Sequence, residues 1–379
     1  MFIMRNCKLL PVCICVLLGA SGNAAGMEVS QKPIFVRGVG GYNVYRIPSL
    51  LTTQAGTLLA FCEAREAGDS SDIDLVMRRS EDGGKTWSRK QVVWDQGTDV
   101  CGNPCPVQDQ ETGVIWLLLT WNDSKFSNSE LHEGRNGADR RVFVCSSEDD
   151  GRTWSTPKDI TDSTKRADWS WYATGPGVGI QLKRGPHAGR LVIPCDHTNE
   201  AGFASHVISS DDHGETWTLG GVVPGRGNEC QVVELADGRL MLNMRMQRNG
   251  EKKRGVSHSS DGGVSWSAIT FDETLIEPVC QGSLLRYSLE RDGAKNRLLF
   301  SNPASRKDRV RMTVRLSYDE GATWSVSKLL HEGPSAYSCL TVLPDGDIGC
   351  LYEGGDSLYG EIVFARFSLD WLTNGEDEL

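Results

Sequence analysis

One eight-residue pattern, Ser-x-Asp-x-Gly-x-Thr-Trp, recurs along this chain. Five copies begin at Ser80, Ser147, Ser210, Ser259 and Ser317, and the fourth has Ser in place of Thr. The intervals between them are 67, 63, 49 and 58 residues. A pattern that returns at such spacing identifies an array of similar supersecondary units. We call each copy an Asp box.

Each Asp box has the chemistry of a tight turn between two strands. The Asp carboxylate can accept hydrogen bonds from its own turn, and Gly adopts a positive φ without strain. The Trp offers a large apolar body for packing between neighbouring sheets. Apolar residues dominate the segments before the boxes, as in residues 73–79 and 141–145, which is typical of strands. We therefore interpret the boxes as turns between outer strands, and not as catalytic or calcium-binding sites.

The repeat predicts an all-β fold. A unit of about 50–65 residues fits about six times into the chain, so we expect a six-bladed β-propeller of four-stranded antiparallel blades. Five blades carry an Asp box. The sixth is expected to come from the C-terminal segment, closed by an N-terminal strand.

The first 26 residues differ from the rest of the chain. Arg5 and Lys8 precede an apolar run, and small residues follow it at positions 21–26. This is typical of a signal peptide, and the apolar run is too short to span a membrane. We therefore expect residues 1–26 to be removed and residues 27–379 to form one exported propeller domain, periplasmic or secreted, without a membrane span.

Charge and cysteine content exclude several classes of function. The formal net charge is −10, and removal of Arg5 and Lys8 makes it about −12, which argues against nucleic acid as a partner. Nine of the 12 cysteines follow residue 26, mostly inside apolar runs, as expected of buried free thiols. Only Cys101 and Cys105 are close enough to suggest a local disulfide. No Cys/His spacing resembles a zinc site, and no metal or organic cofactor is expected.

The segment Tyr45-Arg46-Ile47-Pro48 is the first with a chemical signature. Pro48 cannot donate to a sheet, so the strand must end or kink there. Together with the five Asp boxes, this segment resembles the sialidase (neuraminidase) superfamily of exo-glycosidases over nearly the whole chain after residue 26. The resemblance implies a six-bladed propeller with its site at the centre of one end. It also implies that Arg46 is the first of three arginines that hold the carboxylate of sialic acid, a task suited to a planar, permanently charged guanidinium.

The resemblance also implies roles for Arg65 and an acidic residue after it. Arg65 would contact the sugar ring, and a loop Asp would be the general acid/base. The loop contains Asp69 and Asp72 before the strand that includes Asp74. Alignment on the first Asp box favours Asp69, with Asp72 as the alternative.

The remaining candidates lie in the second half of the chain. Residues 229–245 have the pattern of a β-hairpin, which brings Glu229 and Arg245 together. The resemblance makes Arg245 the second carboxylate-binding arginine, Tyr337 the nucleophile and Glu229 its base, since a phenol with a pKa near 10 needs one. The family's pattern before the last Asp box, Arg, three residues and then Thr, implies that Arg309 is the third arginine, with Arg311 as the alternative.

Other polar and aromatic residues near these motifs are further candidates. Asn103 lies where similar proteins approach the site. The rings of Trp169, Trp171 and Tyr172 form either the wall for the N-acetyl and glycerol groups of the sugar or packing between blades.

The sequence thus predicts a retaining exo-α-sialidase that cleaves terminal sialic acids from glycoproteins, gangliosides and oligosaccharides through a covalent tyrosyl intermediate. One alternative is a trans-sialidase or an intramolecular enzyme that forms an anhydro sugar. A second alternative is a non-catalytic sialic-acid-binding propeller, since Asp boxes also occur in proteins without this activity.

Overall fold

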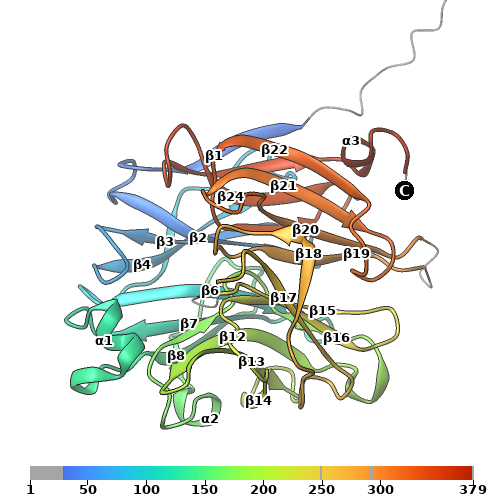
Figure 1. Ribbon diagram of the computed structural model, residues 1–379. Helices are drawn as coiled ribbons and strands as arrows, with labels where there is room; N and C mark the ends of the chain where they lie inside the picture. The colour runs from blue at the N-terminus through green and yellow to red at the C-terminus, as the bar shows by residue number, and fades with distance from the viewer. Residues whose placement is uncertain (1–28, 248–249, 291–293, 378–379) are drawn as a thin grey trace, which may run out of the picture.

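The computed structural model describes residues 29–247, 250–290 and 294–377 (Figure 1). The predicted signal peptide, residues 1–26, lies outside these residues. Nearly all of the regular structure is antiparallel β-sheet. The helices are short: α1 (Asn128–Glu133), α2 (Thr161–Thr164) and α3 (Leu369–Thr373), with single 3₁₀ turns at Arg135–Gly137 and Gly185–His187. No helix in the described part of the chain has the length and apolarity needed to cross a membrane.

Four sheets are separate antiparallel blades, each a simple meander. The sheet that closes the chain contains β1 (Ser30–Val36), β25 (Glu361–Phe367), β24 (Ile348–Gly354) and β23 (Ser338–Val342), in that order. The second contains β10 (Tyr172–Thr174), β12 (Leu191–Asn199), β13 (Gly202–Ser210) and β14 (Thr218–Val222), with β11 (Ile180–Gln181) paired to β12. The third contains β15 (Cys230–Glu234), β16 (Leu240–Met244), β17 (Lys253–Ser259) and β18 (Thr270–Ile276). The fourth contains β19 (Ser283–Ser288), β20 (Arg297–Pro303), β21 (Val310–Ser317) and β22 (Val326–Pro334).

The remaining eight strands form one sheet. It contains β2 (Val44–Thr52), β3 (Leu58–Arg65), β4 (Ile73–Ser80) and β5 (Gln91–Trp94), followed by β6 (Val100–Gln108), β7 (Ile115–Asn122), β8 (Arg141–Ser147) and β9 (Lys158–Asp159). The antiparallel propeller is therefore confirmed. The predicted count of six separate blades is wrong, because only four sheets are separate blades and the remaining eight strands are hydrogen-bonded into one sheet. The amide of Ile73 donates to the carbonyl of Asp99 at 3.2 Å, and this pairing joins two four-stranded meanders through the single residue pair Ile73 and Val100.

The first strands of five meanders, together with β11 of the second sheet, contact one another in a closed ring. The contacts run from β2 to β6, then to β11, β15, β19 and β23, and from β23 back to β2. The expected closure by an N-terminal strand is also confirmed: β1 pairs with β25, so the blue start of the described chain lies against its red end in Figure 1.

The Asp boxes connect the third and fourth strands of their meanders, as predicted. In the first box the Ser80 hydroxyl donates to Asp82 Oδ1 at 2.8 Å, and the Thr86 amide and hydroxyl donate to the two carboxylate oxygens of Asp82 at 2.9 and 2.6 Å. Trp87 packs edge-on against Phe364 of β25, with ring centroids 5.2 Å apart. Gly84 has a φ of +87°, and a Cβ there would lie 2.0 Å from the Phe364 ring, so both conformation and packing require glycine.

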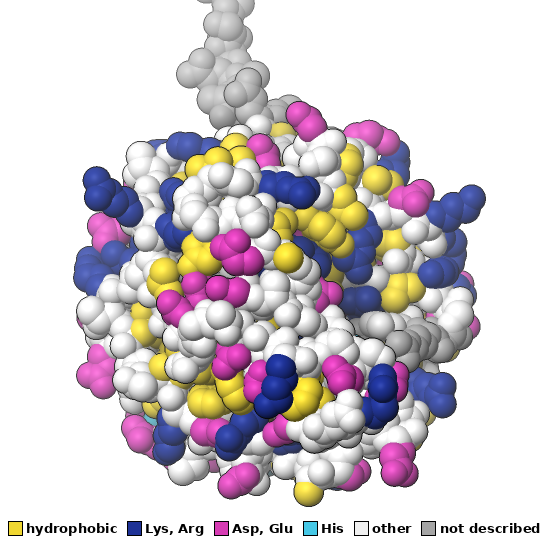
Figure 2. Space-filling model, turned by 90° about the vertical axis from the view of Figure 1, so that its left-hand side faces the viewer, with side chains coloured by type: hydrophobic (Ala, Val, Ile, Leu, Met, Phe, Trp, Pro, Cys, Tyr) yellow, Lys and Arg dark blue, Asp and Glu magenta, His cyan; other side chains and the backbone are white. Residues whose placement is uncertain are grey.

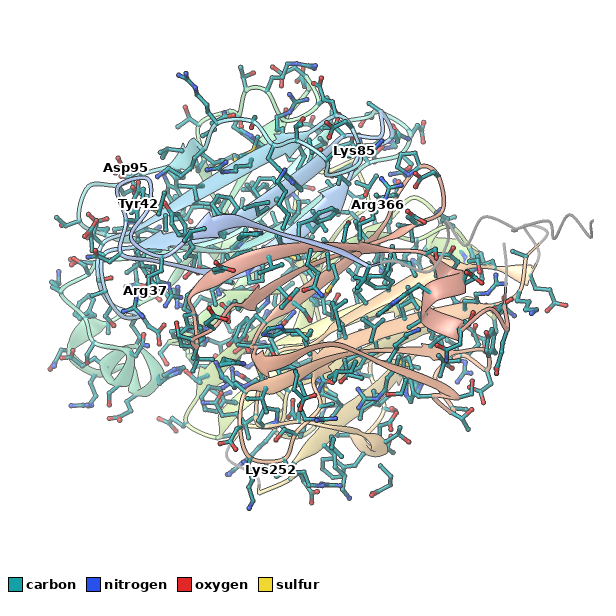
Figure 3. All side chains as sticks on the ribbon, turned by 90° about the horizontal axis from the view of Figure 1, so that it is seen from above. Arg37, Tyr42, Lys85, Asp95, Lys252 and Arg366 are labelled. Atoms are coloured by element: carbon teal, nitrogen blue, oxygen red, sulfur yellow. The ribbon has the colours of Figure 1, made fainter. Side chains whose placement is uncertain are left out.

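The boxes and the candidate site lie at opposite ends of the strands. Figure 3 shows Lys85 of the first box beside Arg366 on one side of the molecule, and Arg37 and Tyr42 on the other. The core between these ends consists of apolar side chains from the strands, and every residue of β3 is buried. The nine cysteines of the described chain are buried and free, so Cys101 and Cys105 form no disulfide.

Candidate active site

A cavity of about 370 Å³ opens at the end of the ring of first strands away from the Asp boxes. All seven side chains singled out in the sequence line it: Arg46, Arg65, Asp69, Glu229, Arg245, Arg309 and Tyr337. They come from four of the five sheets or from the loops between their strands. The face of the molecule in Figure 2 mixes basic, acidic and apolar side chains.

Three guanidinium groups converge on the ring of Tyr337. Arg46 lies in β2, Arg245 directly follows β16 and Arg309 directly precedes β21. The Cζ atoms of Arg46 and Arg309 are 5.2 and 5.5 Å from the centre of the ring, and Arg245 Nη1 donates to its hydroxyl at 2.8 Å. Such a cluster can bind a carboxylate by several charge-assisted hydrogen bonds.

A buried carboxylate, Glu353 of β24, holds Arg46 in place. Its Oε1 accepts from Arg46 Nε at 3.1 Å and from the Ile47 amide at 2.9 Å, and its Oε2 accepts from Arg46 Nη2 at 3.3 Å and from the Tyr337 amide at 3.2 Å. The predicted kink at Pro48 is present as a register shift between Arg46 and Ser49. Ile47 has a φ of +58°, which is strained for a β-branched residue.

Tyr337 and Glu229 form the central pair of the cavity. The Tyr337 hydroxyl donates to Glu229 Oε1 at 2.6 Å, and Arg245 Nη1 donates to Glu229 Oε2 at 2.6 Å. The hairpin of β15 and β16 brings Glu229 to Arg245 as predicted, and the Arg245 amide donates to the Glu229 carbonyl at 2.9 Å. Burial, reinforced by the charge of Glu229, raises the pKa of Tyr337 well above 10, although the three arginines oppose this. A base in contact is therefore needed to ionise it.

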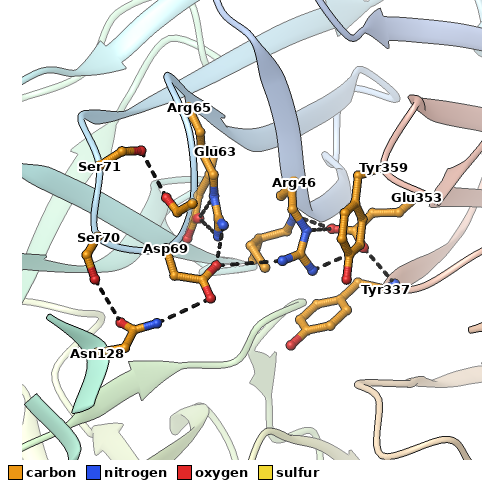
Figure 4. A network of polar contacts seen from close by, with 12 residues as sticks. Arg46, Glu63, Arg65, Asp69, Ser70, Ser71, Asn128, Tyr337, Glu353 and Tyr359 are labelled. Carbon is orange, nitrogen blue, oxygen red and sulfur yellow. Dashed lines mark hydrogen bonds and ion pairs between the residues drawn. The ribbon is translucent and has the colours of Figure 1, made fainter. Parts of the chain in front are cut away.

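Asp69 lies on the loop between β3 and β4 and has a side chain that is 52% exposed. Its Oδ1 accepts from Arg65 and lies 3.7 Å from Arg46 Nη1, and its Oδ2 accepts from Asn128 Nδ2 at 3.2 Å (Figure 4). Partial burial would raise the pKa of Asp69, but Arg65 and Arg46 outweigh this effect and hold it below its usual range. The alternative, Asp72, does not line the cavity.

Arg65 is fixed by a second carboxylate from its own strand. The Glu63 Oε2 accepts from Arg65 Nε at 2.8 Å, and Glu63 Oε1 accepts from the amide of Asn103 at 2.8 Å. Glu63 was not identified from the sequence. Because it lies two residues before Arg65 on β3, strand periodicity could have indicated that both side chains lie on the same face.

The structure separates the two arginines considered for the third position. Arg309 lines the cavity, where its Nη1 donates to the Tyr359 hydroxyl at 2.7 Å and its Nη2 to the Val279 carbonyl at 3.3 Å. Arg311 is exposed and pairs with Glu332 at 2.5 Å. Strand alternation would have placed both on one face, but a register shift between Val310 and Met312 and a φ of +64° at Arg311 interrupt it.

The aromatic residues at 169–172 divide between the two expected roles. Trp171 lines the cavity with His132 stacked on it at a centroid distance of 4.2 Å, whereas Trp169 and Tyr172 belong to a buried core cluster. The Cζ atom of Arg140 lies 4.2 Å from the centre of the Trp171 ring. Burial lowers the pKa of Arg140 to about 10. Asn103 also lines the cavity, as expected.

Several further cavity residues gave no signal in the sequence. They come from segments without a recognised motif: Asn128, His132, Arg140, Asp196, Phe203 and Tyr359. In the described part of the chain, no group of three or more His, Cys, Asp or Glu side chains is arranged to hold a metal ion.

Comparisons with known proteins agree with this geometry. Residues 56–350 match the model of the BNR repeat-like domain. The "Sialidase" of Micromonospora viridifaciens is 38% identical over 358 residues, which cover 90% of this chain and 54% of that protein. The "Exo-alpha-sialidase" of Aspergillus fumigatus is 33% identical over 375 residues, which cover 88% of this chain and 86% of that protein. The chain thus spans about half the length of the first relative and most of the second.

Solved structures show the same architecture. The "Hadza microbial sialidase Hz136" superposes with a TM-score of 0.81 at 32% identity and covers 90% of this chain and 69% of its own. An intramolecular trans-sialidase from Ruminococcus gnavus, solved with oseltamivir carboxylate, superposes with a TM-score of 0.75 at 23% identity over 87% of this chain and 96% of its own, a likeness in fold.

Proposed function

The chain belongs to the sialidase family, and we propose that it is a retaining exo-α-sialidase that releases terminal sialic acids from glycoproteins, gangliosides and oligosaccharides. The observation that carries the proposal is the contact between Tyr337 and Glu229 inside a ring of three arginines. A carboxylate nucleophile would be repelled by the carboxylate of the sugar, whereas a phenol that becomes ionised only as it reacts is not. Sialidases are the known exception to the rule of two catalytic carboxylates in glycosidases.

In the first step, Arg46, Arg245 and Arg309 bind the carboxylate on the anomeric carbon. The Tyr337 oxygen attacks that carbon as its proton passes to Glu229. The bond to the leaving oxygen breaks, and Asp69 protonates that oxygen. The product is a covalent sialyl-tyrosine and a free alcohol.

In the second step, Asp69, now ionised, takes a proton from water, and the water oxygen attacks the anomeric carbon. The bond to Tyr337 breaks, and the phenolate recovers its proton from Glu229. Two displacements at one carbon give net retention of configuration. Together the two steps return Asp69 and Glu229 to the protonation states in which they began.

The position of Asp69 between two arginines suits this cycle. In the free site, Arg65 and Arg46 keep the carboxylate ionised. A bound substrate brings its own carboxylate to Arg46, which offsets that positive charge and so favours protonation of Asp69 in the complex. The exposure of Asp69 also lets water reach it after the alcohol departs, which favours hydrolysis.

The test is to follow the digestion of 3′-sialyllactose and 6′-sialyllactose by proton NMR from the first minutes. We expect the α-anomer of N-acetylneuraminic acid and lactose as the first products. A β-anomer formed first would contradict retention. An anhydro sugar or a new sialyl linkage to an added acceptor would show that the intramolecular or transfer alternative is correct, and binding without cleavage would show a non-catalytic propeller.

We further propose that the protein acts outside the cytoplasm, on the basis of the signal peptide pattern at residues 1–26. N-terminal sequencing of the protein recovered from the medium and the periplasm tests this proposal. Cleavage near residue 25 is the expected result, and an intact N-terminus on protein confined to the cytoplasm would contradict it.

A further inference from the structure

We propose that Asn128 is a positioning residue that holds the Asp69 carboxyl group in both of its protonation states. The inference rests on the proposed function, in which Asp69 alternates between acid and base. Asn128 is the first residue of α1, in the connection between β7 and β8, whereas Asp69 belongs to the connection between β3 and β4. Figure 4 shows the two side chains pointing toward each other, joined by a dashed line.

The contact is a hydrogen bond to one oxygen of the carboxylate. Asn128 Nδ2 donates to Asp69 Oδ2 at 3.2 Å, and Asn128 Oδ1 accepts from the Ser70 hydroxyl at 3.4 Å. The other oxygen, Asp69 Oδ1, faces Arg65 and Arg46. Among the described residues, Arg65 and Arg46 are thus the charged partners of the Asp69 carboxylate, and Asn128 is its neutral hydrogen-bond partner.

A neutral partner is needed because the ionic ones favour a single protonation state. Arginine can only donate, so Arg65 and Arg46 stabilise the carboxylate and oppose the carboxylic acid. An amide carries both a donor and an acceptor. If it turns over, Asn128 can accept the O–H of the protonated acid through its own oxygen, and the Ser70 hydroxyl can accept as readily as it donates. The pair Asn128 and Ser70 can therefore bind either form of Asp69.

The local structure holds Asn128 at this point. Ser127 caps α1 by accepting from the Glu130 amide at 3.3 Å, and the Glu130 side chain accepts from the Ser127 amide at 2.9 Å. At the other end Gly134 has a φ of +61°, and its amide donates to the Glu130 carbonyl. Such a capping box fixes the first turn of a helix. Asp69, by contrast, is half exposed on a loop, where packing does little to orient it.

The test compares Asn128→Ala with Ser129→Ala as the matched control. The Ser129 hydroxyl bonds to Glu133 of the same helix and to Arg135 of the 3₁₀ turn that follows, and Ser129 does not line the cavity. Each variant is assayed on 3′-sialyllactose, whose sugar leaving group needs a proton, and on 4-nitrophenyl sialoside, whose phenolate leaving group does not. We expect Asn128→Ala to lower kcat/KM about tenfold on sialyllactose, a part of the effect of general acid catalysis, and less than about threefold on the aryl sialoside. Ser129→Ala should match the wild type on both.

The pH profile separates positioning from a merely structural role. The charged groups around Asp69 are Arg65, Arg46 and Arg140, and they remain in the variant. A hydrogen bond to the ionised carboxylate is stronger than one to the neutral acid, so losing both raises the pKa of Asp69, and the alkaline limb of kcat/KM should move up by about half a pH unit in Asn128→Ala. In Asn128→Asp, a second carboxylate beside Asp69 should move it further in the same direction.

Equal losses on both substrates with an unchanged pH profile would overturn the inference, as would wild-type activity in Asn128→Ala. Thermal unfolding of each variant shows whether a loss reflects misfolding, and Asn128→Asp, which keeps the shape of the side chain, provides the same pH test if Asn128→Ala is unstable. Failure of the wild type to cleave either substrate would instead contradict the proposed function, and the inference with it.

Discussion

Tyr337 and Glu229, which are 108 residues apart in the sequence, are joined by a hydrogen bond of 2.6 Å in the buried part of the cavity. Arg245 contacts both side chains through the same nitrogen, Nη1. Burial raises the pKa of the Tyr337 hydroxyl. Glu229 is in direct contact to accept its proton, and Arg245 lies beside the phenolate that would form. This relationship allows a phenol to act as nucleophile near neutral pH, and its removal gives the first prediction.

Tyr337→Phe should lower kcat on sialyllactose on the order of 10³-fold, because the variant lacks the nucleophilic oxygen while the base and the arginines remain. Binding of N-acetylneuraminic acid, measured by calorimetry, should change only a few-fold. Tyr287→Phe, which removes a hydroxyl that donates to the Gly346 carbonyl at 2.8 Å away from the cavity, is the control. Wild-type kcat in Tyr337→Phe would show that another residue is the nucleophile.

The pH dependence of activity should follow Asp69. The acid must be protonated to act, and its pKa in the free enzyme is held below the usual range, so kcat/KM should fall as pH rises through that lowered pKa. The alkaline limb of kcat should lie at higher pH, since the substrate carboxylate offsets the charge of Arg46. Arg65→Gln removes the nearest positive charge and should raise the limb of kcat/KM by about one unit.

Arg311→Gln, which removes an arginine outside the cavity, should leave that limb where it is. If the limb is the same in Arg65→Gln as in the wild type, Asp69 is not the group that titrates.

Glu353→Ala should be strongly destabilising. Its side chain is 0% exposed, and its removal leaves Arg46 without its nearest counter-charge, with only Asp69 at 3.7 Å, and the amides of Ile47 and Tyr337 without this acceptor. Breaking a buried pair in this way costs about 3–5 kcal/mol of unfolding free energy. Urea unfolding measures the loss, and KM should rise because Arg46 is no longer oriented.

The control for this prediction is Glu332→Ala. Glu332 is 66% exposed and pairs with Arg311 at the surface, so its removal should change stability by less than about 0.5 kcal/mol. Similar losses in the two variants would contradict a special role for Glu353.

Asp82→Ala in the first Asp box should affect stability and leave catalysis unchanged. Hydrogen bonds from the Thr86 hydroxyl and amide lower the pKa of Asp82 to about 2, but the group is exposed, so we expect a loss of only about 1 kcal/mol. Because its folded pKa lies below the unfolded value, this contribution is present above about pH 4 and disappears as pH falls through 2.

Unfolding experiments at pH 7 and pH 2 should therefore show a difference between Asp82→Ala and the wild type at the higher pH only. A fall in kcat/KM of the folded variant would contradict the separation between the Asp boxes and the site.

Local sequence patterns were enough to predict the turns and the kind of fold. An Asp box is complete within eight residues, because Ser80, Asp82 and Thr86 satisfy one another and the glycines supply the backbone conformation. The hairpin that joins Glu229 to Arg245 is similarly local, so strand periodicity was enough to predict it. The family resemblance supplied the remaining candidates, and the structure brings all seven into one cavity.

Side chains that strand periodicity treats alike are distinguished by their three-dimensional surroundings. Arg309 and Arg311 have the same strand parity, and a bulge with a positive φ directs only Arg309 to the cavity. The supports of the site were also invisible in the sequence: Glu353 reaches Arg46 across 307 residues, and Asn128 reaches Asp69 from another meander. A turn depends on the energies of neighbouring residues, whereas these contacts depend on how closure of the ring brings distant strand ends together, which no local pattern records.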